Sequence, residues 1–335
     1  MLCDIDQRFN FKILTIKFYH LEYSKFPNYE EICKKIIEFK KKELVKFDST
    51  LHKNINEYCK LIESELYNYF PFLPYTCTIM NSKEINLDFY RVRELEQFNN
   101  TNLITEHSFP PIPFTKIGRC NFPKNPVFYC SNNPITSLCE VTRNTEYENK
   151  NYCISVWKIK KNISVDTNIH NFLYSDLPEE NFFKKLKDIE IQKIDKIFGD
   201  NLSQSQKNGL NELMKFIHTE FINDIDYSIS STLSHTRIYA NHQYSADILI
   251  YPSNQSNRVG INFAIHPNYV NNMMEIKRLY IIKALKLIND QNNFEIKFKS
   301  YADLNNNRFI WKEMPDDLNE IRKIIQSDFK NGKFE

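Results

Sequence analysis

The chain has 335 residues, 41% hydrophobic and 26% charged, which is enough for one large domain or two moderate ones. This composition excludes wholesale disorder, because the apolar side chains suffice to build a packed core. Lys and Arg number 44 against 42 Asp and Glu, a formal net charge of +2. Such a balance argues against a protein whose main task is to coat nucleic acid or an anionic membrane.

The eight cysteines show no pattern of a metal site. None stands in a CxxC pair, and no Cys/His set has zinc-finger spacing. The opening stretch MLCDIDQRFNFKILTIKFYH lacks the basic and apolar regions of a secretory signal, and no apolar run approaches the ~18 residues of a transmembrane helix. We therefore expect a cytoplasmic protein with reduced thiols, no bound metal and no membrane contact.

Residues 1–75 predict a mainly helical N-terminal segment. Apolar side chains recur at helical spacing in one run around Ile32 and in a second around Leu61. Between the two runs, Asp48, Ser49 and Thr50 supply a helix stop and a new N-cap. PFLP at 71–74 then breaks the pattern, and we place a domain boundary there. We expect this segment to be regulatory or to bind a partner; the alternative is a pair of helices whose charged faces are only solvated.

Strand patterns begin near residue 84 and indicate a second domain over residues 76–335. The expected strands lie in INLDFYRVRE, NPVFYCS, NYCISVWKI, ISVDT, SADILIYPS, VGINFAIHP, EIKRLYIIKAL and FEIKFKSY. A helical insertion is predicted over about residues 178–242, and PDDLNEIRKIIQSDF predicts a closing helix. There is no regular βαβ alternation, P-loop or GxGxxG pattern, so the expected class is α+β and not a doubly wound nucleotide fold.

Polar residues in this second domain form clusters that could carry chemistry. The clusters are Tyr90 and Arg91 in the strand DFYRVRE, Arg119 and Asn121 in a turn before NPVFYC, Glu140 in the apolar run SLCEV, and Ser253 at the end of ADILI. Each residue alone has an ordinary structural explanation. Their combination in one compact unit favours chemistry on a phosphate-bearing substrate.

Two of the chain's glycines stand beside these clusters. Only five glycines occur in the whole chain. We therefore expect Gly118 and Gly260 to occupy positions that need either a positive φ or a close approach of the backbone to another group.

The same stretches resemble the RES domain, a toxin family named for its Arg, Glu and Ser. The likeness covers about residues 84–270, and two departures from the family pattern are Cys120 in place of Trp and FPKN in place of Pro-Pro-Gly. The matching stretches are FYR at 89–91, GRCN at 118–121, FYCS at 128–131, SLCEV at 137–141, YPS at 251–253 and GIN at 260–262.

The resemblance implies an ADP-ribosyltransferase-like core of mixed β-sheet and an enzyme that cleaves the nicotinamide–ribose bond of NAD+, by hydrolysis or by phosphorolysis. Glu140 would stabilise the oxocarbenium-like transition state and hold a ribose hydroxyl. Arg91, and after it Arg119, would bind the pyrophosphate, and Ser253 would donate a hydrogen bond to the substrate. The remaining expected binding residues are Tyr129, beside the nicotinamide or ribose, and the supporting Tyr90 and Asn121.

Several functions stay open within this resemblance. The same pocket could transfer ADP-ribose to a protein, or the chain could be a catalytically inactive module that senses NAD or ADP-ribose. The inactive module predicts erosion of the Arg-Glu-Ser set, which is intact. As a toxin or bacterial defence effector, the chain would have a separate antitoxin or an activating protein as partner, no direct contact with nucleic acid, and an oligomeric state that includes a homo-oligomer among the alternatives.

Overall fold

A computed structural model describes residues 13–16, 26–143, 146–181, 183–185, 187–188, 191–192, 198–288, 293–305 and 308–329. Within them eleven strands form one sheet: β1 (Ile13–Ile16), β2 (Thr76–Asn81), β3 (Asp88–Glu94), β4 (Phe128–Ser131), β5 (Asn151–Ile159), β6 (Asp166–Asn171), β7 (Ile248–Pro252), β8 (Ile261–Ile265), β9 (Met274–Ile288), β10 (Asn293–Asn305) and β11 (Arg308–Glu313). Their spatial order is β1-β2-β6-β7-β8-β4-β3-β5-β9-β10-β11. All neighbours are antiparallel except β6 and β7.

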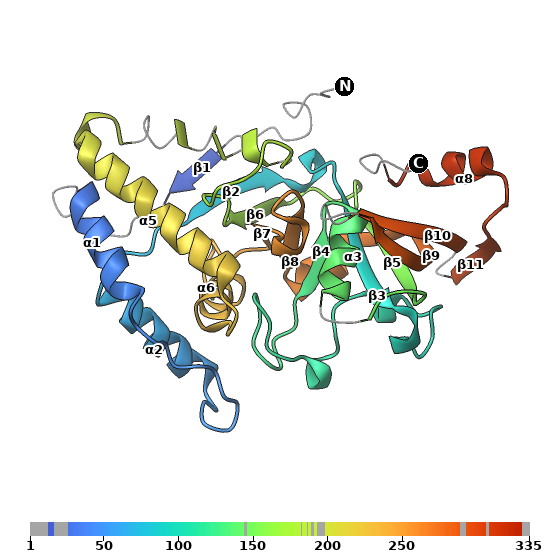
Figure 1. Cartoon of the computed structure of the whole chain (residues 1–335), viewed down its shortest axis with the longest axis horizontal. Coiled ribbons are helices and arrows are strands. Elements are labelled where there is room, and N and C mark those ends of the chain that lie inside the picture. Colours follow the sequence, from blue (N-terminus) through green and yellow to red (C-terminus); the bar gives the residue numbers. More distant parts are fainter. Residues whose placement is uncertain are drawn as a thin grey trace.

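Seven helices accompany the sheet within the described residues: α1 (Tyr29–Phe39), α2 (Ile55–Tyr67), α3 (Pro134–Thr142), α5 (Gln204–Asn223), α6 (Ser228–Ile238), α7 (Pro267–Met273) and α8 (Leu318–Ile325). Figure 1 shows α1, α2, α5 and α6 gathered at the end of the sheet that holds β1, β2 and β6, with α8 at the other end near β9, β10 and β11. The chain contains both helices and strands in large number, and the strands form one mixed sheet. This confirms the α+β class.

The expected insertion contains α5 and α6, and several residues between 182 and 197 lie outside the described set. A capping box begins α5, in which Ser203 and Gln206 satisfy each other's free backbone groups. The closing helix is present as α8, with Asp317 as its N-cap. The N-termini of α5 and α8 can therefore be recognised from their cap residues, Ser203 and Asp317, in the sequence.

The helices of the N-terminal segment belong to a core that later elements share. Ile32 of α1 and Phe70 after α2 are buried in one hydrophobic cluster with Phe216 of α5 and Leu249 of β7. The same segment also supplies β1, which pairs with β2 across the proposed boundary. The division at residue 75 stays a prediction, but α1 and α2 bury their apolar faces against the rest of the chain.

The central strands separate two of the hydrophobic clusters by simple alternation. Phe128 and Cys130 of β4 lie in one cluster with Phe263 of β8, whereas Tyr129 and Ala264 belong to the other. Side chains at successive strand positions point to opposite faces, so each of these strands contributes to both. The candidate site lies where this alternation places polar side chains on the face that carries α3, α5 and α6.

Candidate functional site

One register row runs across β3, β4, β8 and β7 beside the site, and three of its residues, Ser131, Asn262 and Tyr251, line the pocket. Tyr90 of β3 pairs with Ser131 of β4, Ser131 pairs with Asn262 of β8, and Asn262 pairs with Tyr251 of β7. A pocket of about 260 Å³ opens beside this row. Its lining includes Arg91, Arg119, Tyr129, Glu140, Arg143, Tyr227, Tyr251 and Asn262.

Helix α3 brings the glutamate to this pocket. Asn133 caps the helix by accepting hydrogen bonds from the backbone N–H groups of Ile135 and Thr136, at 2.7 and 3.2 Å. Pro134 occupies the first turn, where a missing N–H costs nothing. The Ser137 hydroxyl donates to the backbone carbonyl of Tyr90 at 2.5 Å, which fixes the helix against β3. Glu140 then follows Ser137 by three residues, on the side of α3 that lines the pocket.

The two oxygens of Glu140 have different partners. Oε1 accepts hydrogen bonds from the Ser253 hydroxyl at 2.6 Å and from Nδ2 of Asn262 at 2.7 Å. The Ser131 hydroxyl donates to Oδ1 of Asn262 at 2.7 Å, which sets the orientation of that amide. Among the described residues, Oε2 has one ion-pair partner, the Arg143 guanidinium at 3.6 Å. The carboxylate is therefore held rigidly through Oε1, and Oε2 is the oxygen left to interact with a ligand.

Arg91 reaches the pocket where β3 and β4 part. These strands share one register pair, Tyr90 with Ser131, and beyond it Nη1 of Arg91 donates to the Tyr129 carbonyl at 3.0 Å. The guanidinium lies 5.6 Å from the centre of the Phe128 ring. Burial, and then the charge of Arg93, lower the pKa of Arg91 to about 10, so it stays cationic at neutral pH. Its Nε is buried without a hydrogen-bond partner among the described residues.

The Gly118–Asn121 turn supports Tyr129 on the other wall. Tyr129 Oη accepts from the Cys120 backbone N–H at 2.7 Å and donates to Asn121 Oδ1 at 2.9 Å. A Cβ at Gly118 would lie 2.8 Å from that Oδ1 and 3.0 Å from Tyr129 Oη, so the turn needs glycine for close approach, as expected. Arg119 donates to the Phe221 carbonyl, and its guanidinium lies 5.7 Å from the Tyr227 ring centre.

The structure brings together Arg91, Arg119, Tyr129 and Glu140, all of which line the pocket. Ser253 is fully buried, and its hydroxyl donates to Glu140 and not toward the pocket. Asn121 is also buried and supports Tyr129 from behind.

Tyr90, expected in the binding set, has its side chain elsewhere. Its ring packs in a cluster with Leu138 and Phe329, and its hydroxyl donates to the backbone carbonyl of Asp328. Tyr90 is absent from the residues that line the pocket, although its backbone carbonyl holds Ser137 of α3.

Several lining residues had no role in the sequence analysis, and three of them contact the candidate site's charged groups: Asn262, Arg143 and Tyr227. Asn262 stands in the GIN stretch already compared with the family, so a signal for it existed. Arg143 follows Glu140 by three residues, a spacing that places both on one helix face. Tyr227 had no local signal: it lies in a left-handed conformation (φ 61°) before α6 and accepts a 3.3 Å hydrogen bond from Nη2 of Arg143, 84 residues away.

Charge in the pocket is dominated by arginine. Arg91, Arg119 and Arg143 line it, with Glu140 as the one carboxylate and no histidine among the lining residues that the structure describes. Burial raises the pKa of the Cys139 thiol to about 12 and of the Cys120 thiol to about 11, so neither neighbouring cysteine is a thiolate at neutral pH. This arrangement favours binding of an anion with a carboxylate beside it.

In the described part of the chain, no helix is both long enough and apolar enough to cross a bilayer, and no group of three or more His, Cys, Asp or Glu side chains could hold a metal ion. The chain matches no family model, no curated protein and no solved structure. Its functional interpretation therefore depends on the residues and geometry described above.

Proposed function

We propose that the chain is an NAD-consuming enzyme of the RES type, which cleaves the nicotinamide–ribose bond of NAD+. The observation that carries the proposal is the pair of fixed donors on Glu140 Oε1, which leave Oε2 beside a pocket lined by three arginines. Such a carboxylate suits a reaction that develops positive charge on a sugar carbon.

In this proposal the bond between ribose C1 and the nicotinamide nitrogen breaks, and its electron pair neutralises the pyridinium ring. The ribose becomes oxocarbenium-like, and Glu140 Oε2 stabilises that charge and accepts a hydrogen bond from a ribose hydroxyl. Water then adds to C1 and loses a proton to the solvent. Ser253 and Asn262 keep the carboxylate in place. In this proposal Ser253, which is fully buried, bonds Glu140 and does not make the expected hydrogen bond to the substrate.

The pyrophosphate would be held by the arginines, since a planar guanidinium matches phosphate oxygens. Arg143 is the best placed, because its contacts of 3.3 and 3.6 Å are long and its side chain is 37% exposed. Arg119 has one guanidinium nitrogen on the Phe221 carbonyl and lines the same pocket. Arg91, the first choice from the resemblance, lines the pocket and has Nη1 on the Tyr129 carbonyl.

The wider setting follows from the resemblance alone. A RES-type enzyme would act in the cytoplasm as a toxin or defence effector and would be restrained by a separate antitoxin or released by an activating protein. Transfer of ADP-ribose to a protein uses the same electrophile with a different acceptor, so the products of the reaction separate this alternative from hydrolysis.

The test is NAD consumption by the purified full chain beside Glu140→Gln. Glutamine can place its carbonyl oxygen on the two donors that hold Oε1 and so preserves the local structure, but it removes the negative charge. We expect a loss of rate on the order of a hundredfold or more, with Glu148→Gln, an exposed control, unchanged. Wild type that binds NAD without consuming it would favour the sensing module, and wild type that does neither would refute the proposal.

A further inference from the structure

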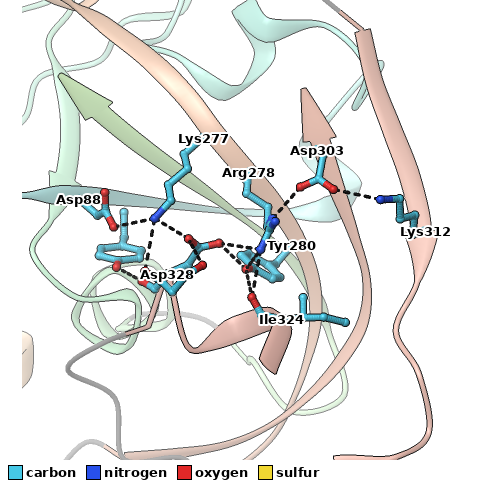
Figure 2. A network of polar contacts seen from close by, with 10 residues as sticks. Asp88, Lys277, Arg278, Tyr280, Asp303, Lys312, Ile324 and Asp328 are labelled. Atoms are coloured by element: carbon cyan, nitrogen blue, oxygen red, sulfur yellow. Dashed lines mark hydrogen bonds and ion pairs between the residues drawn. The ribbon is translucent and has the colours of Figure 1, made fainter. Parts of the chain in front are cut away.

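A buried carboxylate near the end of the described chain is enclosed by a dedicated set of partners (Figure 2). Asp328 has no exposed surface. Lys277 Nζ lies 2.6 Å from its Oδ1, Arg278 Nη1 lies 3.2 Å from its Oδ2, and the Tyr280 hydroxyl donates to Oδ2 at 2.5 Å. All three partners come from β9, and Asp328 comes from the segment that follows α8.

Other acids share the charge of these cations. Lys277 also contacts Asp88 of β3 at 3.1 Å, and Arg278 Nε lies 2.8 Å from Asp303 of β10 (Figure 2). A carboxylate out of water is costly unless it is paired and hydrogen-bonded, so the network accepts Asp328 in one defined position. The segment after α8 is therefore held in place by ion pairs and a hydrogen bond to Asp328, and not by apolar packing alone.

Tyr90 connects this seat to the strand that carries Arg91. Its hydroxyl donates to the backbone carbonyl of Asp328, and its ring centre lies 6.0 Å from that of Phe329. Burial raises the pKa of Tyr90, so the phenol remains a donor at all physiological pH values.

The backbone of the same residue contacts the candidate site. The Tyr90 carbonyl accepts the 2.5 Å hydrogen bond from Ser137 of α3, and Tyr90 pairs with Ser131 of β4. Ser131 in turn donates to Asn262, which donates to Glu140. Each step from Asp328 to Glu140 is thus a hydrogen bond, or a strand pair, between neighbouring residues.

We propose that Tyr90 is a positioning residue, through which the seating of Asp328 sets the positions of Arg91 and Glu140 in the pocket. The segment 318–329 would then control the site from outside, and anything that unseats it would loosen β3 and α3. The activity arm of this inference rests on the proposed function, because it takes NAD as the ligand of the pocket.

A purely structural anchor makes a different prediction. If Asp328 only fastens the end of the chain, its loss frees 318–329 or lowers the stability of the whole protein, but it does not loosen the pocket selectively. Local amide exchange separates these cases, since segments that open independently report their own opening free energies.

The experiment compares amide exchange in the full chain for wild type, Tyr90→Phe, Asp328→Asn and the control Asp303→Asn. Phe keeps the ring of Tyr90 and removes only the donor, and Asp303 belongs to the same network but faces β11 through Lys312. We expect Tyr90→Phe and Asp328→Asn to speed exchange in 88–94 and 134–142 by roughly threefold to tenfold, the effect of one lost hydrogen bond. Exchange in β2 and β6 should not change, and Asp303→Asn, whose partners are Arg278 of β9 and Lys312 of β11, should affect β9, β10 and β11 without speeding exchange in 88–94 or 134–142.

Unchanged exchange in 88–94 and 134–142, or equal acceleration throughout the sheet, would overturn the proposal. NAD kinetics form the second arm: Tyr90→Phe should lower kcat and raise KM together, because Glu140 and Arg91 are both displaced, and an unchanged kcat and KM would also count against it. If wild type fails to consume NAD, the proposed function fails, but the exchange arm still decides whether Tyr90 positions the pocket.

Discussion

Nδ2 of Asn262 donates a 2.7 Å hydrogen bond to Oε1 of Glu140, joining β8 to a helix that lies 122 residues earlier in the chain. The Ser131 hydroxyl donates to the amide oxygen of Asn262. A flipped amide would place that oxygen against the Glu140 carboxylate, which cannot donate to it, so the observed orientation is favoured. This fixed amide explains why Glu140 has one immobilised oxygen and one that faces Arg143. The proposed cleavage of the nicotinamide–ribose bond depends on the orientation of this carboxylate and not on its presence alone.

Asn262→Ala should therefore reduce NAD turnover while the chain remains folded. Glu140 would keep Ser253 but lose the second donor, and a hydrogen bond to a charged group is worth about 1.5–3 kcal/mol. We expect kcat to fall about tenfold or more, measured by nicotinamide release. Asn268→Ala, at an exposed position, is the matched control. Equal rates for the two variants would show that Asn262 does not hold the catalytic carboxylate.

Arg143→Gln should weaken ligand binding with little effect on stability. The side chain is 37% exposed and its two contacts are long, so the folded state loses little when the charge is removed. Loss of one charge-assisted contact to a phosphate predicts about a tenfold higher Kd for ADP-ribose by calorimetric titration. Arg322→Gln on the exposed face of α8 controls for net charge. An unchanged Kd for Arg143→Gln would remove this arginine from the proposed binding set.

Much of the fold could be predicted because its signals are local. Alternating strands, the Pro-rich break after α2 and the caps of α5 and α8 are each readable within a few residues. Gly260 also met its expectation: a Cβ there would lie 2.0 Å from Thr136 Oγ1, a close approach that only glycine tolerates.

The rest depended on contacts between distant segments. Tyr90 was expected in the pocket because it precedes Arg91, but alternation along β3 gives neighbours different surroundings, and the sequence did not show what would cover each face. Tyr227 joins the site only through the turn between α5 and α6, whose position depends on how those helices pack. Arg143 could not be recognised as a pocket residue from the sequence, because the position of the pocket beside α3 was not known.

Ile32→Ala should destabilise the protein much more than Ile37→Ala, although both residues lie on α1. Ile32 is fully buried in the cluster shared with α5, whereas Ile37 is 59% exposed. Replacing a large apolar side chain by Ala in a packed core lowers the free energy of unfolding by about 2–5 kcal/mol. The same replacement at an exposed position lowers it by about 0.5 kcal/mol or less. Urea unfolding of the full chain measures both. Similar losses would mean that α1 is not part of the common core.

The same packing allows a test of whether the N-terminal segment, which we expect to be regulatory or to bind a partner, inhibits the proposed activity. Removing residues 1–75 would expose the apolar faces of α5 and α6 and the edge of β2. We therefore expect residues 76–335 to aggregate or melt far below the full chain, and not to gain activity. A stable, more active 76–335 fragment would contradict this and would favour autoinhibition.

Acidification should destabilise the fold through buried histidines, among them His107 and His170. Burial lowers the pKa of His107 to about 4 and that of His170 to about 3, from an ordinary value of 6.5. Below pH 6.5 these histidines are protonated in the unfolded chain but stay neutral in the folded chain. The free energy of unfolding therefore falls as the pH drops from 6.5 toward 4 for His107 and toward 3 for His170. Each histidine contributes up to about 1.4 kcal/mol per pH unit in that window. His107→Gln should remove about one proton from the slope of unfolding free energy against pH between 6 and 4.5, and an unchanged slope would show that His107 is not the residue responsible.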